Sequence, residues 1–332
     1  MKAIRIAAHG GPEALELVDL PDPTPGPGEV AVRVTHVGLN HLDVWVRRGV
    51  PGHRFPLPLV PGSDIVGLRE DTGERVALHP GFGCGACQRC LSGQHSLCRR
   101  YLIRGERTDG GCRERLCVPL SHLLPCPLPG EAAAALPLAL LTAWQMLVGR
   151  ARIKAGDRVL IQGGASGVGS LAIQIAALHG ARVAAVASSE DKRALCLNLG
   201  AVRAWYLEEA AECARSWTGK EGVDIVVEHT GAATWETSLR ALRWGGTLVT
   251  CGATTGHEVQ LDLRALFFKQ ISLLGSTMGS MGELVTAWEQ VLAGRIRPVV
   301  DRLMSMREIG AAQALLEERR VAGKVVLVQD LA

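Results

Sequence analysis

The fold is decided by residues 158–169, which read Arg-Val-Leu-Ile-Gln-Gly-Gly-Ala-Ser-Gly-Val-Gly. The apolar run at 158–162 predicts a buried strand, and the apolar positions at 169–178 predict the helix that follows. Small residues at 163–169 let the backbone approach a pyrophosphate, whose oxygens accept from free N–H groups at the helix start. Ser166 takes the place of the middle glycine of a dinucleotide fingerprint. The stretch therefore predicts a phosphate-binding loop with contacts from Gly164, Ser166, Gly167, Val168 and Gly169.

Strands and helices continue to alternate after this loop. Strands are predicted at 181–187, 224–227 and 247–251, and a helix at 190–199. Such alternation implies parallel strands joined by crossover helices in a doubly wound sheet. Before residue 130 the pattern differs, because short apolar runs alternate with Pro- and Gly-rich turns and predict a compact β-rich domain. The last elements, helices near 283–292 and 308–319 and a strand at 324–328, are expected to return to that first domain.

Composition restricts the class of protein. A chain of 332 residues is long enough for two domains, and 47% hydrophobic with 21% charged residues is typical of a soluble globular protein. The net charge of +3 is small and basic residues are scattered among acids, which argues against nucleic-acid and membrane partners. Residues 1–6 resemble an opening strand more than a secretory signal, and Pro137 interrupts the apolar run at 132–144. We therefore expect a cytoplasmic protein.

Four cysteines, Cys84, Cys87, Cys90 and Cys98, lie in one glycine-rich run. Their spacing lets four thiolates converge on a single tetrahedral Zn²⁺. A zinc ion with four sulfur ligands has no open position for a substrate, so we predict one structural zinc in a lobe at about residues 80–100. The remaining cysteines are expected to be small core residues, because this usage fits a reducing compartment better than a disulfide framework.

The end of the second strand indicates which dinucleotide binds. An NAD-binding protein places an acid there, about 20 residues past the glycine-rich loop, to accept from the ribose hydroxyls. Residues 187–189 read Ala-Ser-Ser, with no acid at position 188 to repel a 2′-phosphate. NADP(H) is therefore expected in preference to NAD(H), and the candidate phosphate donors are Ser188, Ser189, Lys192 and Arg193. In the alternative, the two basic residues face solvent and Glu190 or Asp191 reaches the ribose.

The whole chain resembles the medium-chain dehydrogenase/reductase family, which includes zinc alcohol dehydrogenases and quinone oxidoreductases. The resemblance rests on an ordered series of segments, residues 10–13, 37–43, 61–67, 84–98, 164–169 and 323–327. It implies a GroES-like catalytic β-domain at 1–132 and 279–332 and a Rossmann NADP(H)-binding domain at 133–278. It also implies an active site in the cleft between the two domains.

The chain departs from the zinc enzymes at the ligands of the catalytic metal. Those enzymes use a Cys in a Gly-x-Cys-x-x-Asp segment, a His in Gly-His-Glu, and usually a Cys at the start of the helix leading into the Rossmann domain. This chain has Asn40, Ser63 and Leu138 there. Amides and hydroxyls are poor zinc ligands at neutral pH, and leucine is none. We expect no catalytic zinc, with a different metal site built from His41, Asp43 and Asp64 as the alternative.

Without a metal, polarising a substrate carbonyl falls to hydrogen-bond donors aimed at its oxygen. The resemblance to quinone oxidoreductases implies that Asn40 lies near the nicotinamide and donates through its amide, and Ser63 is a second candidate. Asp43 and Asp64 stand where zinc relatives have an acid that orients a ligand and an acid close behind the metal. Here they are expected to order water or to fix His41.

His41 and Trp45 are the other catalytic candidates. In relatives the basic residue at position 41 often contacts the cofactor pyrophosphate, and proton transfer or a structural role are the alternatives. Trp45 stands where quinone oxidoreductases commonly have a tyrosine, so it is expected to give the pocket an apolar wall unless it only packs in the core.

Further cofactor contacts follow from the resemblance. Thr142 resembles a threonine that faces the nicotinamide, and Lys324 is a candidate donor to the cofactor, unless it is an ordinary surface lysine. The other candidates follow later strands, at the edge where such sheets bind ligands: Thr230, Gly231, Cys251, Gly252, Gly275, Ser276 and Thr277. The strand at 271–274 pairs across a dimer interface in relatives, so a homodimer or homotetramer is expected.

These features together predict an oxidoreductase that works without catalytic zinc. Hydride would pass from C4 of NADPH to a quinone, to the β-carbon of an enone, or to another small carbonyl substrate, while the protein supplies orientation and electrostatics and water supplies the proton. One alternative is a zinc-type alcohol or aldehyde dehydrogenase, because the four-cysteine lobe is typical of that branch. The other is a non-catalytic NADPH-binding protein.

Overall fold

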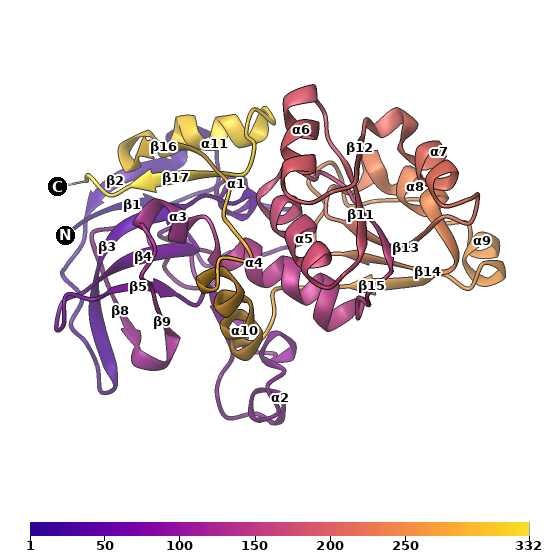
Figure 1. The fold of residues 1–332 in the computed structure, drawn as a ribbon. Coiled ribbons are helices and arrows are strands. Elements are labelled where there is room, and N and C mark those ends of the chain that lie inside the picture. Colours follow the sequence, from indigo (N-terminus) through magenta and orange to yellow (C-terminus); the bar gives the residue numbers. More distant parts are fainter. Residues whose placement is uncertain (332) are drawn as a thin grey trace. The chain divides into compact units, whose positions relative to one another are not determined.

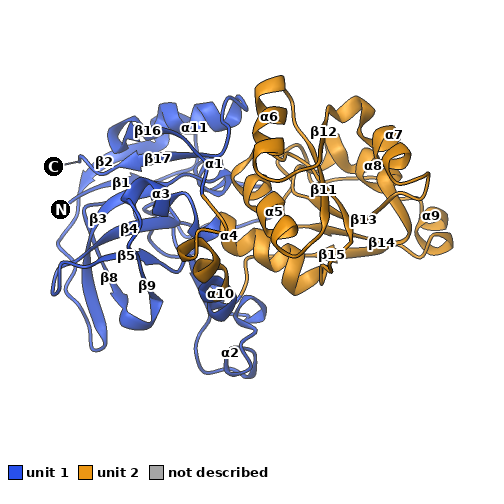
Figure 2. Cartoon of the chain, viewed as in Figure 1, with its two compact units in different colours: residues 1–138, 280–285, 298–332 blue, residues 139–279, 286–297 orange. Residues whose placement is uncertain are grey.

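The computed structural model describes residues 1–331, and the chain divides into two compact units. The first unit comprises residues 1–138, 280–285 and 298 onward, and the second comprises 139–279 and 286–297 (Figure 2). The first unit is thus discontinuous in sequence. Two helices, α4 (Pro137–Trp144) and α10 (Met281–Leu292), begin in the first unit and end in the second.

A seven-stranded sheet forms the centre of the first unit. Its strands are β3 (Glu29–Gly38), β4 (Asp64–Arg69), β5 (Arg75–Leu78), β8 (Arg115–Pro119), β9 (Leu123–Pro125), β16 (Val300–Ser305) and β17 (Lys324–Val328). They are ordered β16-β17-β3-β4-β5-β9, with β8 also on β3. Along β3, Val30, Val32 and Val34 are buried while Arg33 faces outward, which is the period of two expected of a sheet with one face on the core.

Smaller elements complete the first unit around this sheet. The strands β1 (Lys2–Ile6) and β2 (Leu15–Asp19) form an antiparallel pair, and β6 (Gly81–Phe82) pairs with β7 (Leu102–Ile103) at the base of the cysteine lobe. The helices are α1 (His41–Arg48), α2 (Gln88–Leu91), α3 (Gly130–Ala134) and α11 (Ile309–Glu317). Short 3₁₀ turns occupy Pro12–Ala14, His95–Leu97, Leu120–His122 and Met306–Glu308.

The second unit contains a six-stranded parallel sheet. Its strands are β10 (Arg158–Ile161), β11 (Arg182–Val186), β12 (Arg203–Trp205), β13 (Val223–Glu228), β14 (Leu242–Thr250) and β15 (Ser272–Gly275). Their order is β12-β11-β10-β13-β14-β15, the 3-2-1-4-5-6 order of a dinucleotide-binding sheet. The chain adds β11 and β12 on one side of β10 and then β13, β14 and β15 on the other side, so the strand order reverses between β10 and β13.

Helices cover both faces of the parallel sheet. α5 (Gly167–Leu178) and α6 (Glu190–Asn198) lie on one side, and α7 (Leu207–Trp217) and α8 (Ala232–Ala241) on the other (Figure 1). A π-helical segment, Gln145–Arg150, and α9 (Leu263–Phe268) complete the unit. Val159, Leu160 and Ile161 of β10 are all fully buried, as expected for a strand covered on both faces. The predicted combination of a β-rich domain and a doubly wound parallel sheet is confirmed.

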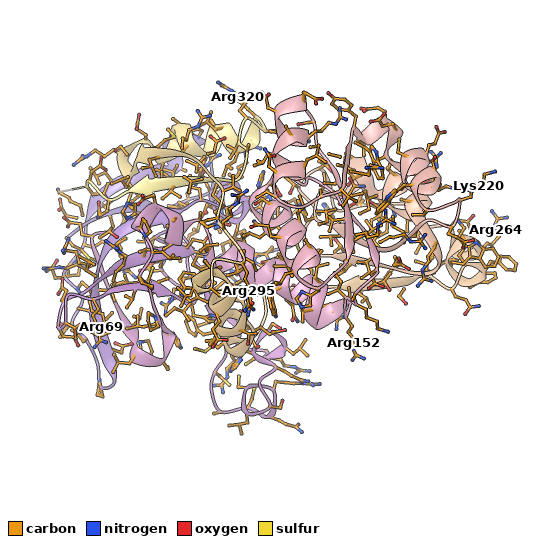
Figure 3. The ribbon with its side chains drawn as sticks, in the orientation of Figure 1. Arg69, Arg152, Lys220, Arg264, Arg295 and Arg320 are labelled. Atoms are coloured by element: carbon orange, nitrogen blue, oxygen red, sulfur yellow. The ribbon has the colours of Figure 1, made fainter. Side chains whose placement is uncertain are left out.

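Several basic side chains in both units pair with acids that are near them in sequence. Among the basic residues labelled in Figure 3, Arg69, Arg264 and Arg320 each pair with an acid two positions away, Asp71, Asp262 and Glu318. Within residues 1–331, no helix is both long enough and apolar enough to span a lipid bilayer.

Candidate functional site

The four cysteines of the lobe converge. Their Sγ atoms all lie within 4.8 Å of one another, with 3.6 Å between Cys87 and Cys90 and 3.7 Å between Cys87 and Cys98. Zinc–sulfur bonds of about 2.3 Å in a tetrahedron place the sulfurs about 3.8 Å apart. Local structure sets this geometry, because Cys87 caps α2 and Cys90 lies on its first turn. The cluster therefore fits a structural zinc ion.

The surroundings of the cysteines are consistent with metal binding. Backbone N–H groups of Ala86 and Cys87 lower the pKa of Cys84 to about 5, whereas burial raises the pKa of Cys90 to about 11. A metal would therefore displace a proton from Cys90 on binding. A Cβ at Gly83 would lie 2.4 Å from the Cys90 sulfur, so glycine is required there.

At the positions expected for a second zinc, the structure holds a network of hydrogen bonds instead. Lys324 Nζ donates to Asn40 Oδ1 at 2.7 Å and to Asp64 Oδ2 at 2.8 Å. Asn40 Nδ2 donates to the same Asp64 oxygen at 3.0 Å, and the backbone N–H of Leu138 donates to Asp64 Oδ1 at 2.6 Å. Asp64 is 0% exposed and Lys324 4%. An ammonium group thus lies beside the carboxylate that in zinc enzymes stands behind the metal.

This network has a simple local origin. Asn40 caps the start of α1, two residues after β3 ends at Gly38, while Asp64 begins β4 and Lys324 begins β17. β3 lies between β4 and β17 in the sheet, so the starts of β4 and β17 meet the end of the antiparallel β3. The three side chains are therefore neighbours although 260 positions separate Asp64 from Lys324.

Asp43 and Ser63 also have partners inside the first unit. Asp43 accepts from the backbone N–H of Asn40 at 2.7 Å, as the third residue of a helix often does, and from that of Gly62 at 3.0 Å. It is fully buried, and burial raises its pKa to about 6. The Ser63 hydroxyl donates to the Arg104 carbonyl at 2.6 Å. Both side chains hold backbone segments in place around Asn40.

A catalytic zinc does not fit this arrangement. Within residues 1–331, the four-cysteine cluster is the one group of three or more His, Cys, Asp or Glu side chains close enough to share a metal. Asn40 and Asp64 are held by Lys324, a cation that would repel a metal ion at the same place. His41 and Trp45 lie half-buried on the first turns of α1.

In the second unit, the glycine-rich loop has the geometry of a phosphate site. Ser166 caps α5 by accepting from the backbone N–H of Gly169 at 2.9 Å. A Cβ at Gly169 would lie 2.3 Å from the Gly163 carbonyl oxygen, so glycine is needed for close packing of the helix on the strand. The loop ends in the N-terminus of a twelve-residue helix, where free N–H groups favour an anion. Gly164 lies in this loop, and Gly167 and Val168 are the first two residues of α5.

The residues that distinguish the two dinucleotides follow β11. Ser188 is exposed, and Ser189 caps α6 by accepting from the Lys192 backbone N–H at 3.4 Å. Arg193 is engaged elsewhere, because it pairs with Glu190 at 2.9 Å and stacks 4.5 Å above the Tyr206 ring. Arg193 is therefore a weaker candidate for the 2′-phosphate than the sequence alone indicates.

The later cofactor candidates lie at or near the carboxyl edge of the parallel sheet. Thr230 follows β13, Cys251 and Gly252 follow β14, and Ser276 follows β15, whose last residue is Gly275. Burial raises the pKa of Cys251 to about 12, so its thiol stays neutral. Ser276 Oγ is buried without a hydrogen-bond partner. Thr142 is buried within α4.

Sequence reasoning missed two residues at this edge, Gln162 and His229. His229 packs against the loop, since a Cβ on Gly163 would lie 3.0 Å from its ring. Gln162 Oε1 and His229 Nε2 are buried without hydrogen-bond partners, and burial lowers the pKa of His229, which keeps the ring neutral. Unpaired polar atoms at the edge that binds ligands point to contacts completed by a bound molecule. The sequence pattern that could have identified each of them is a polar residue directly after a mostly apolar strand.

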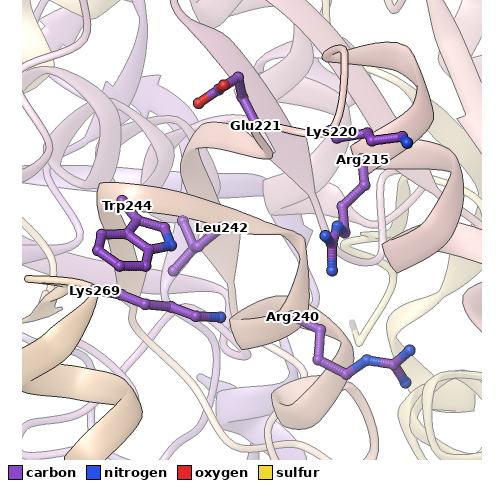
Figure 4. Close-up of a pocket in the computed structure, with 7 residues that line it drawn as sticks. All are labelled: Arg215, Lys220, Glu221, Arg240, Leu242, Trp244 and Lys269. Atoms are coloured by element: carbon purple, nitrogen blue, oxygen red, sulfur yellow. The ribbon is translucent and has the colours of Figure 1, made fainter.

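A separate pocket of about 410 Å³ lies at the opposite, amino edge of the parallel sheet (Figure 4). Leu242 begins β14, Glu221 precedes β13 and Lys269 precedes β15, which places the pocket away from the glycine-rich loop. Its lining also includes Arg215, Lys220, Arg240 and Trp244. These long side chains are mostly exposed. Because the pocket lies at the amino edge of the sheet, we do not include it in the candidate site.

Comparisons with known proteins match the whole chain. A family described as alcohol dehydrogenase GroES-like domain matches residues 26–128, and one described as zinc-binding dehydrogenase matches residues 167–293. Crotonyl-CoA carboxylase/reductase of Cereibacter sphaeroides is 30% identical, covering 98% of this chain and 87% of that protein. Acryloyl-coenzyme A reductase of Metallosphaera sedula is 29% identical over 98% and 99% of the two chains. A crystal structure of an NAD-dependent alcohol dehydrogenase has a TM-score of 0.95 and 44% identity, covering 99% of each chain.

Proposed function

This chain belongs to the medium-chain dehydrogenase/reductase family, and we propose that it is an NADP(H)-dependent reductase of enones or quinones that works without catalytic zinc. The observation that carries the proposal is the Lys324–Asn40–Asp64 network at the positions of the catalytic metal. Two of the named relatives act, by their names, on crotonyl-CoA or acryloyl-CoA, whose carbon–carbon double bonds are conjugated to a carbonyl.

In this proposal the cofactor supplies a hydride from C4 of its nicotinamide ring. The glycine-rich loop and the start of α5 hold its pyrophosphate through backbone N–H groups. Ser188 and Lys192 bind the 2′-phosphate of NADPH, and the unpaired Gln162 and His229 complete contacts at the carboxyl edge. The cofactor preference rests on the absence of an acid at position 188.

Lys324 takes over the electrostatic part of the metal's role. An ammonium group has three donors, and two are engaged by Asn40 and Asp64. The third stays available for an oxygen that gains negative charge as hydride arrives at the β-carbon. Asp64 holds the ammonium in place through a buried ion pair at 2.8 Å, so little reorganisation is needed when that charge develops.

The overall reaction balances with one proton from water. NADPH, a proton and the enone give NADP⁺ and the saturated ketone: hydride adds to the β-carbon, the double-bond electrons move to the carbonyl as an enolate, and the α-carbon then takes the proton. The buried, neutral His229 and the two buried carboxyls Asp43 and Asp64 are not required as the proton source. Their roles in this proposal are binding and orientation.

The proposal is tested by cofactor oxidation with a panel of quinones, enones and aldehydes, combined with metal analysis. We expect turnover of enones or quinones by protein that contains one zinc ion per chain and is unaffected by mild chelation. Lys324→Met should lower kcat with little change in the Kd of NADPH, and the matched surface variant Lys220→Met should leave both unchanged. Two tightly held zinc ions per chain, or reversible loss of activity on chelation, would refute the zinc-free mechanism.

An alcohol or aldehyde dehydrogenase is the second candidate. It is favoured by the four-cysteine cluster and by the name of the solved structure that is 44% identical, which also describes an NAD-dependent enzyme. In that case the panel would show alcohol oxidation with NAD⁺ and no enone reduction. Saturable NADPH binding without turnover of any substrate would favour a non-catalytic binding protein.

Assembly and location are part of the same proposal. β15 is an edge strand of the parallel sheet, and Leu263, Phe267 and Phe268 on the neighbouring α9 are exposed. An unpaired edge beside apolar side chains favours pairing with a second copy, so we propose a homodimer or homotetramer, testable by light scattering. Ten cysteines, none of them in a disulfide within the described residues, fit the reducing environment of the cytoplasm that we propose for this protein.

A further inference from the structure

Arg104 is a buried cation without an anionic partner. It follows β7 in the first unit and is 5% exposed. Its Nε donates to the His79 carbonyl at 3.4 Å, its Nη2 donates to His122 Nδ1 at 2.9 Å, and its guanidinium lies 4.8 Å from the centre of the Phe82 ring. Within residues 1–331, no carboxylate lies within 4.0 Å of it and its Nη1 makes no hydrogen bond.

The side chains in direct contact with Arg104 are neutral, while the charges of Arg113 and Glu29 act on it from beyond contact distance and in opposite directions. Burial lowers the pKa of His122 and of His79 to about 4 each, so both rings are uncharged at neutral pH. The pKa of Arg104 is lowered by burial only to about 10, which leaves the guanidinium charged. His79 is 1% exposed and its Nε2 is buried without a hydrogen-bond partner. The guanidinium therefore lies beside a buried imidazole nitrogen that has no hydrogen-bond partner.

The other deeply buried arginine shows what a structural role requires. Arg47 is 1% exposed, and its Nη2 pairs with Glu317 at 2.8 Å while Nε donates to Gln313 at 2.6 Å. A buried charge that lacks such a partner is strongly unfavourable, because desolvation is not offset by an opposite charge. Arg104 has the burial of Arg47 without its carboxylate.

We propose that Arg104 binds an anionic oxygen group, a carboxylate or phosphate, carried by the substrate. The fork of the guanidinium is suited to such groups, and Nη1 is available for one. The Arg104 carbonyl holds the Ser63 hydroxyl at 2.6 Å, and Ser63 directly precedes Asp64 of the Lys324 network. The assignment rests on the proposed enone reduction, and it restricts the substrate to an enone that also carries an acid group.

The first arm of the test measures anion binding without turnover. Inorganic phosphate is titrated calorimetrically into the full chain with saturating NADPH present, which blocks the glycine-rich loop. We expect one site that Arg104→Gln weakens about 10-fold or more, the loss typical of a hydrogen bond to a charged group. The matched control is Arg113→Gln, since Arg113 lies in the same segment but pairs with Asp109 at 3.5 Å. Absent binding, or equal binding by both variants and wild type, would overturn the site.

The second arm decides whether the anion belongs to the substrate. 4-Oxopent-2-enoate and its methyl ester contain the same enone with and without a negative charge. In Arg104→Gln, kcat/KM for the acid should fall about 10-fold or more relative to the ester. An unchanged ratio, with phosphate binding still dependent on Arg104, would mean a site for a free anion and would refute the substrate assignment. If neither compound is reduced, the proposed enone reduction is refuted, and the phosphate titration still shows whether Arg104 binds an anion.

A second variant covers the possibility that Arg104→Gln does not fold. Arg104→Lys keeps the charge but loses the fork, so phosphate affinity and the acid-to-ester ratio should both fall by an intermediate amount, about 3-fold or more. Near-ultraviolet circular dichroism checks that each variant is folded. Wild-type values in folded Arg104→Lys would contradict recognition through the guanidinium.

Discussion

The ion pair between Lys324 and Asp64 predicts a large and specific loss of stability when only one partner is removed. At 2.8 Å and an effective dielectric constant of about 20, the attraction between the charges is about 6 kcal/mol before desolvation. Removing one partner of a buried pair typically costs about 3–5 kcal/mol. Asp64 keeps its hydrogen bonds from Leu138 and Asn40, so we expect Lys324→Met to destabilise the first unit by about 3 kcal/mol.

The double variant Lys324→Met/Asp64→Asn separates the ion pair from packing. Because replacing both charges removes the unpaired carboxylate, the double variant should recover most of the loss. Lys220→Met, at an exposed lysine, is the surface control and should change stability by less than about 0.5 kcal/mol.

The assay must report on the first unit, since a two-unit protein need not unfold in one step. Urea unfolding gives the overall change, and hydrogen exchange of peptides covering β3 and β17 locates it. Faster exchange is expected in both strands of Lys324→Met. Unchanged stability of that variant, or a double variant as unstable as the sum of its single changes, would show that the pair does not carry the energy assigned to it.

Three further predictions follow from the same geometry. Burial raises the pKa of Asp43 to about 6, so between about pH 4 and 6 the folded protein keeps a proton on Asp43 that the unfolded chain has lost. The free energy of unfolding should therefore fall by about 3 kcal/mol as the pH rises through that window. Asp43→Asn should flatten the corresponding part of a plot of urea midpoint against pH. Cys98→Ser should remove the one zinc per chain measured by mass spectrometry and lower the thermal midpoint, while Cys117→Ser on β8 should do neither; zinc retained in Cys98→Ser would contradict the cluster. Lys192→Ala should raise the KM for NADPH about 10-fold more than that for NADH, and equal changes would refute its contact with the 2′-phosphate.

Most of the fold was predictable because its patterns are local. The predicted strand at 324–328 has the observed bounds of β17, and the helix predicted at 190–199 is α6, Glu190–Asn198. The strand predicted at 247–251 is longer in the structure, since β14 starts at Leu242. Its first residues include Arg243, Trp244 and two glycines, which have no apolar alternation to reveal a strand.

The candidate site was less predictable, because its partners are distant in sequence. Asn40 and Asp64 were identified as candidates, but nothing local indicates that Lys324 joins them through the sheet order β17-β3-β4. Likewise, an arginine at 104 reads as an ordinary surface residue until the fold buries it among His79, Phe82 and His122. Burial and missing counter-charges are properties of the fold that residue spacing does not reveal.

The position of β17 in the middle of a sheet also bears on how the protein is made. β17 lies between β16 and β3, and it carries the lysine of the buried network. A ribosome adds Lys324 only after all six strands of the parallel sheet have been synthesised. Until then the nascent first unit lacks the β17 partner of β3 at residues 36–38 and Asp64 lacks its cation, while the second unit has all of its strands. Although its chain starts first, the unit with the Lys324 network completes its fold last.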